Sequence, residues 1–238
     1  MRKILFFILI AFSVVANGQS PWAKKEYSNW CFGSGNLITF NSNNTIDTAL
    51  FSGNNNIFMA YESCSSVSDS NGNLLFATNG VDVFSSNGDV MQGGNGTLLV
   101  GREDRLDYGS ASQGAYIVKH PQNDSMYYVF TTDDALSQST YGFNYAVINI
   151  KANNGLGRVE NIKRLGNYRT TEQCSAIMHA NGVDVWVVTH KSGSKSLMAY
   201  LLTVNGIDNP MSPVISNVAF PVTSKTGNEP VSYTHLTL

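Results

Sequence analysis

The chain has 238 residues, a formal net charge of −2 and only 13% charged side chains. Nucleic-acid surfaces need clustered Lys and Arg, so this balance argues against a nucleic-acid partner. Polarity is carried instead by Asn, Ser, Thr and 21 Gly, a composition typical of β-rich proteins with many tight turns. One all-β domain is ordinary at this length.

The N-terminal segment 1–18 predicts a secretory signal peptide. Arg2 and Lys3 precede the apolar run 4–12, and small residues at Ala16 and Gly18 form a cleavage signal. The run is shorter than the roughly 20 residues that span a bilayer, and no later segment approaches that length. We therefore expect an exported protein, secreted or at the cell surface, without a membrane span, whose residues 19–29 form a polar lead-in.

Short apolar strands separated by Asn-Gly or Asn-rich turns follow in chain order. The expected strands are 30–33, 37–40, 74–78, 81–84, 115–120, 126–130, 145–150, 159–165, 186–189, 197–203 and 214–220. The Asn-Gly dipeptide favours hairpins in which both turn residues have positive φ. We interpret the Gly-rich stretch 92–107 as a loop, and the absence of a helical period predicts an all-β chain.

A repeated pattern organises these strands. The segments 64–76, 115–130 and 174–188 each run from an apolar strand through a polar turn into an aromatic-rich strand, with Asp69, His120 and His179 at the equivalent position. Such spacing is typical of four-stranded propeller blades, about 40–60 residues each. The predicted fold is β-propeller-like, with about four blades of an incomplete ring over 30–230.

The last eight residues, 231–238, match the translation of a transposon-derived sequencing adapter. We expect them to be an artefact, and we expect the natural reading frame to continue past Pro230 into further domains of the same chain.

Three cysteines remain after the signal peptide: Cys31, Cys64 and Cys174. Cys64 and Cys174 share a place in two repeats, which fits either a disulfide or metal pair, or a slot for a small buried residue. No zinc spacing is present, and we expect neither metal nor cofactor.

Possible chemistry is weighed against structural roles. The segment 69–73 has the oxygen spacing of a calcium loop but lacks that loop's Gly and Glu, so a hairpin turn is the simpler interpretation. His120 and His179 suit a repeated turn-capping role. A pair of facing carboxylates for sugar hydrolysis is weighed against solvated turn acids, which is the simpler interpretation of all six candidates: Glu62, Asp82, Asp133, Asp134, Glu172 and Asp184.

The best place for a ligand rim follows the strand 126–130. Asp133 and Asp134 precede a Ser-rich loop, Tyr141 and Phe143 lie beside it, and His190 ends a strand that could face a central opening. Aromatic faces with nearby amides suit carbohydrate or protein contacts, although blade packing also uses aromatics.

The motifs at 29–33, 66–80 and 179–190 resemble the propeller-like N-terminal region of large Bacteroidota surface proteins. Those proteins carry a gliding-motility-associated C-terminal domain, the type B sorting domain of type IX secretion. The resemblance covers most of residues 29–220, although Cys31 stands where an aromatic residue is expected. It implies surface display and transfers no catalytic residue.

The leading hypothesis is therefore a non-enzymatic, exported module for adhesion, or for binding a surface glycan or protein, within a larger cell-surface protein. Two alternatives stay open. One is a secreted carbohydrate-active or sialidase-like propeller enzyme, and the other is a structural, motility-associated surface component.

Overall fold

This computed structural model describes residues 25–54, 57–96, 98, 100, 110–134 and 141–216. Strands dominate these ranges, which contain no α-helix and only two short 3-10 helices, η2 (Lys25–Tyr27) and η3 (Asn153–Gly155). The prediction of an all-β chain is confirmed. The expected signal peptide and the segment 231–238 lie outside the described residues.

The strands form four small antiparallel sheets in chain order, and none of the four closes on itself. Sheet I contains β1 (Asn29–Phe32), β2 (Asn36–Phe40) and β3 (Ile46–Leu50). Sheet II contains β4 (Ser65–Ser68), β5 (Leu74–Thr78) and β6 (Val83–Ser85). Sheet III contains β7 (Ala115–Lys119), β8 (Met126–Thr132), β9 (Phe143–Asn149) and β10 (Arg158–Leu165). Sheet IV contains β11 (Thr170–Met178), β12 (Val185–Lys191), β13 (Leu197–Thr203), β14 (Gly206–Asp208) and β15 (Val214–Ile215), the last two both pairing with β13.

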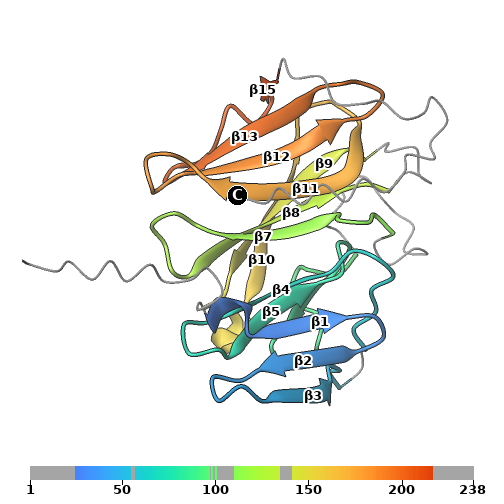
Figure 1. Cartoon of the computed structure of the whole chain (residues 1–238), viewed down its shortest axis with the longest axis vertical. Helices are drawn as coiled ribbons and strands as arrows, with labels where there is room; N and C mark the ends of the chain where they lie inside the picture. Colours follow the sequence, from blue (N-terminus) through green and yellow to red (C-terminus); the bar gives the residue numbers. More distant parts are fainter. Residues whose placement is uncertain are drawn as a thin grey trace, which may run out of the picture.

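The sheets follow one another along the long axis of Figure 1, from sheet I in blue to sheet IV in orange. Three apolar clusters hold them together, between sheets I and II, II and III, and III and IV. Sheet III therefore has both faces covered, which explains why burial in β8 and β9 is nearly continuous rather than alternating.

The first strand of each sheet contacts the first strand of the next. β1 contacts β4, β4 contacts β7, and β7 contacts β11. An isolated parallel bridge between Gln113 and Gln173 adds to this order. A single line of neighbouring strands thus runs through all four sheets.

The Asn-Gly turns differ from the sequence expectation in one respect. At Gly72 (φ 93°), Gly80 (φ 85°) and Gly88 (φ 83°) the glycine alone has positive φ and the preceding asparagine stays in the ordinary region, whereas Asn154 and Gly155 both have positive φ (55° and 87°). The prediction of positive φ at both turn residues was wrong for the first three of these turns. Each asparagine or aspartate side chain accepts backbone N–H groups instead, as Asp69 does from Asn71 and Asn73, and this bonding stabilises a turn followed by a left-handed glycine.

Candidate functional site

The candidate residues gather at one edge of the sheets, which we call the strand-start edge. In an antiparallel meander the first strand begins where the second ends and the third begins. Register confirms this for sheet III, where Ala115 faces Thr131 and Thr132 faces Phe143. The ends of β8 and β10 and the starts of β7, β9 and β11 therefore share this edge.

Asp133 holds the base of the loop that follows β8. Its side chain is buried; Oδ1 accepts the backbone N–H of Asp134 at 2.9 Å and Oδ2 accepts that of Tyr141 at 2.8 Å. The backbone N–H of Asp133 also donates to the carbonyl of Gly142. This carboxylate thus ties the two ends of the loop together and positions Tyr141 at the edge.

The other predicted residues divide between the edge and the core. Asp134 is buried beside Asp133, and Tyr141 is half-buried at the edge. Phe143 is fully buried, because it begins β9 and packs against Phe130 and Tyr200 at ring-centroid distances of 5.8 and 5.7 Å. The prediction that Phe143 contacts a ligand was wrong, since a core side chain cannot reach one.

His190 lies near the end of β12, where Lys191 pairs with Thr170 at the start of β11, so it also lies at the strand-start edge. Val187 and Thr189 of this strand are buried against sheet III, and alternate residues of a strand face opposite sides. His190 therefore belongs to the face of sheet IV that is turned away from sheet III. The structure brings Asp133, Asp134 and Tyr141 together and leaves His190 on that far face of sheet IV.

Sequence reasoning missed a bridge that joins three sheets at this edge. The hydroxyl of Ser112 donates to Glu172 at 2.9 Å and lies 3.3 Å from a carboxylate oxygen of Glu62, while the backbone N–H of Ser112 also reaches Glu172. Nearby, the hydroxyl of Ser63 donates to the carbonyl of Ala111. Glu62 shortly precedes β4, Ser112 shortly precedes β7, and Glu172 lies near the start of β11. The bridge therefore links the starts of three first strands.

Two buried threonine hydroxyls lie at the same edge. Thr132 ends β8 and Thr170 begins β11, and neither hydroxyl oxygen has a hydrogen-bond partner among the described residues. A buried polar group without a partner costs free energy, so such a group can contribute to binding when a ligand or water reaches it. The edge therefore combines carboxylates, hydroxyls and tyrosines.

The repeat histidines lie at the opposite edge and have structural roles. Nδ1 of His120 accepts the backbone N–H of Gln122 at 3.2 Å, and Nδ1 of His179 accepts that of Asn181 at 3.1 Å. The rings pack against Tyr128 and Trp186. The predicted turn-capping role is confirmed for both.

The cysteines do not form the pair that their repeat positions suggested. All three are free, and Cys64 and Cys174 belong to the regions of sheets II and IV, with sheet III between them. Cys174 is buried in the cluster between sheets III and IV, where desolvation raises the pKa of its thiol to about 12. Cys64 is exposed, so the idea of a small buried residue at this slot holds for Cys174 and is wrong for Cys64.

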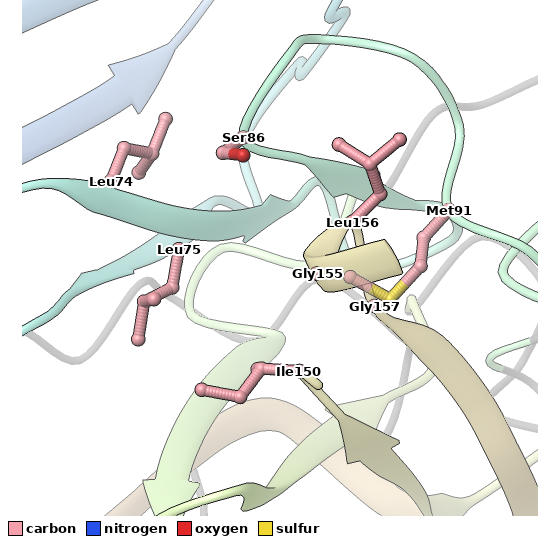
Figure 2. Close-up of a pocket in the computed structure, with 8 residues that line it drawn as sticks. All are labelled: Leu74, Leu75, Ser86, Met91, Ile150, Gly155, Leu156 and Gly157. Carbon is pink, nitrogen blue, oxygen red and sulfur yellow. The ribbon is translucent and has the colours of Figure 1, made fainter. Parts of the chain in front are cut away.

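A small depression lies at the opposite edge, between sheets II and III (Figure 2). Its volume of about 30 Å³ suits one or two water molecules rather than a substrate. Met91 packs closely against Gly157 and fills part of it. Eight residues line it: Leu74, Leu75, Ser86, Met91, Ile150, Gly155, Leu156 and Gly157.

Within the described ranges, no three His, Cys, Asp or Glu side chains are placed to hold a metal ion, and no helix is long and apolar enough to cross a membrane. No protein-family model matches the chain, and no curated protein matches it.

Proposed function

We propose that the protein is an exported, β-propeller-like binding module of a larger cell-surface protein, and that it binds a surface glycan or protein without catalysing a reaction. Four consecutive antiparallel sheets with neighbouring first strands support the propeller-like part of this proposal. The signal-peptide pattern of segment 1–18 and the resemblance to type IX-secreted surface proteins support export and display.

The observation that carries the binding role is the bridge of Glu62, Ser112 and Glu172. It gathers the starts of three first strands at one edge, beside Tyr61, which is 61% exposed. Tyr141 lies at this same edge. Tyrosine rings stack on sugar faces or on partner side chains, and carboxylates accept hydrogen bonds from hydroxyl groups, so this edge suits a polar ligand.

The side chains with catalytic potential favour binding over catalysis. The Asp133 carboxylate is occupied by two backbone N–H groups, and His120 and His179 cap turns at the other edge. A glycan hydrolase would need two carboxyl groups facing each other across a substrate. Asp133, the most buried acid of the edge, instead accepts hydrogen bonds from the backbone at both ends of the loop.

A glycan and protein panel tests this proposal. The secreted chain is immobilised and screened against bacterial and plant polysaccharides, and each ligand found is also assayed for release of reducing ends. We expect Tyr61→Ala and Tyr141→Ala to weaken binding about tenfold or more, as expected for lost aromatic anchors. Tyr27→Ala is the matched control, since Tyr27 is equally exposed but lies in η2, next to the turn at Gly72 on the opposite edge.

Two results would overturn the proposal. Ligand cleavage that accompanies binding would favour the carbohydrate-active alternative, and equal losses in the Tyr27 control would place the ligand elsewhere. Export and display are tested separately by reading the source DNA beyond Pro230. Further blades followed by a type B sorting domain would support them, and a stop codon there would contradict them.

A further inference from the structure

Two chain segments run antiparallel past each other where sheet I meets sheet II. At one end, Asn29 donates from Nδ2 to the hydroxyl of Ser68 at 2.9 Å, and the hydroxyl of Ser66 donates to the carbonyl of Asn29 at 2.6 Å. At the other end, the backbone N–H of Ala60 donates to Gly33, and Ser34 forms an antiparallel bridge with Met59. Only a few residues separate the two contacts on each segment, from Asn29 to Gly33 on one and from Ala60 to Ser66 on the other.

Cys31 and Cys64 lie between the two contacts. Cys31 is two residues from Asn29 on β1, and Cys64 is two residues from Ser66. Counting two residues along each segment from the Asn29–Ser66 contact brings Cys31 opposite Cys64, and counting from the Ala60–Gly33 contact brings it opposite Glu62, so Cys64 lies within two residues of the position that faces Cys31. β1 and β4 belong to different sheets and contact each other along this stretch, and a disulfide joins cysteines whose Cα atoms are about 4.4–6.8 Å apart.

The side chain of Cys31 is on the face of β1 that is turned toward sheet II. Burial alternates along β1, and Asn29 and Cys31 are its two buried residues. Asn29 contacts Ser68 of β4, and Cys31 packs with Ala77 and Phe84 of sheet II. The nearness of Cys64 also contributes to a raised pKa of Cys31, about 12, of which burial is the larger cause.

We propose that Cys31 and Cys64 form a disulfide that joins sheet I to sheet II under oxidising conditions, while Cys174 stays a free thiol. Cys64 is exposed and meets the oxidant first, whereas Cys31 is buried and acts as the resolving thiol. Cys174 is buried in the cluster between sheets III and IV, away from both. The proposal concerns the folded chain and does not depend on the proposed function.

The reaction with glutathione disulfide balances in two exchanges. The Cys64 thiolate attacks one sulfur of glutathione disulfide, which forms a mixed disulfide and releases one glutathione thiolate. The Cys31 thiolate then attacks the Cys64 sulfur, which closes the Cys31–Cys64 bond and releases the second glutathione. The protein loses two protons and two electrons, and one glutathione disulfide becomes two reduced glutathiones.

Peptide mapping tests this directly. The folded full chain is incubated with glutathione disulfide at pH 8, alkylated, digested without reduction and analysed by mass spectrometry. We expect one crosslinked peptide that contains Cys31 and Cys64, and a fall in alkylatable thiols from three to one. Cys174→Ser should give the same crosslink, and Cys31→Ser should stop the reaction at a glutathione adduct on Cys64.

The proposal is overturned if the folded wild-type chain carries only a glutathione adduct on Cys64, or if it crosslinks through Cys64 to a second copy. A Cys64–Cys174 crosslink would also overturn it. Because Cys31→Ser places a hydroxyl in the core, Cys31→Ala serves as a second variant. A circular dichroism spectrum like that of the wild type verifies that each variant is folded.

Discussion

Sheets I and III have the same antiparallel meander and differ in how much of each is covered. In sheet III nearly every residue of β8 and β9 is buried, because sheets II and IV pack on its two faces. In sheet I the described contacts cover one face, and all five residues of β3 are exposed. The same hairpin topology therefore supports a dense core in one place and a half-open sheet in the other.

The difference shows that strand topology fixes pairing but not stability. Trp30 and Phe40 in sheet I form an edge-to-face pair at 5.1 Å while staying 53% and 39% exposed. In sheet III the equivalent kind of contact is fully buried. Aromatic pairs contribute more when burial accompanies the contact, so sheet III should dominate the free energy of unfolding.

The strongest test replaces a ring in each sheet. Phe130 is fully buried and lies within 6.2 Å of the rings of Tyr128, Phe143 and Tyr145. We expect Phe130→Ala to lower the free energy of unfolding by about 3–5 kcal/mol, and Phe40→Ala by about 1 kcal/mol or less. Urea denaturation followed by tryptophan fluorescence measures both, and equal losses would contradict the contrast between the sheets.

The next test removes the tie between sheets I and II. Asn29 is buried; its Nδ2 donates to Ser68 and to the carbonyl of Gly72, and its Oδ1 accepts from Thr39. Asn29→Ala leaves several of these groups unpaired and should cost about 2–3 kcal/mol. Hydrogen exchange should then speed up in sheet I while sheet III keeps its protection. The exposed Asn36 of the same sheet, changed to Ala, is the control and should alter neither.

A smaller effect is expected at a repeat turn of sheet IV. His179→Ala removes the Nδ1 acceptor of the Asn181 N–H and the ring contact with Trp186, and should cost about 1 kcal/mol. His179→Asn should restore most of the loss, because an amide oxygen can accept the same N–H. Exchange of the Asn181 amide reports the cap locally. If His179→Ala leaves that exchange rate unchanged, the histidine does not cap the turn.

The smallest effect is expected at the corresponding turn of sheet II, where Asp69 takes the place that His179 has in sheet IV. The side-chain amide of Asn73 and the backbone N–H groups of Asn71 and Asn73 lower the pKa of Asp69 below its usual 3.8. Asp69 therefore stabilises the fold above about pH 3.8, and this contribution is lost as the pH falls below that value. The turn is solvent-exposed, so the contribution is a few tenths of a kcal/mol at most.

Comparing the unfolding curves of the wild type and Asp69→Asn between pH 2 and pH 7 measures this contribution. The wild type should lose more stability than the variant on acidification, and parallel pH profiles would contradict the assigned bond.

Much of the fold was predictable because each repeat contains turn residues that mark where its strands end. The strands 74–78 and 197–203 match β5 and β13 residue for residue, and the alignment of Asp69, His120 and His179 places each directly after the first strand of its sheet. The sequence did not predict β3. Its five residues are all exposed, and its apolar and polar residues do not alternate. Exposed edge strands leave little hydrophobic signal.

The candidate site was less predictable, because it depends on contacts between sheets. Phe143 follows Gly142 and resembled a loop residue, yet it begins a strand whose two faces are both covered. The interpretation as solvated turn acids was wrong for Asp82, Asp133 and Asp134, which are buried. Glu62 and Glu172 share the hydroxyl of Ser112. One signal was available: the three precede Asp69, His179 and His120 by seven, seven and eight residues, so they occupy nearly equivalent places in three repeats.

The line of first strands, β1 to β4 to β7 to β11, has a mechanical consequence. Each apolar cluster joins only consecutive sheets, so a pulling force applied between the N-terminal and C-terminal sheets loads the three interfaces in series. The weakest interface then yields first, and the chain lengthens one sheet at a time rather than in a single rupture. Stepwise extension of this kind separates one interface at a time while the remaining sheets stay folded.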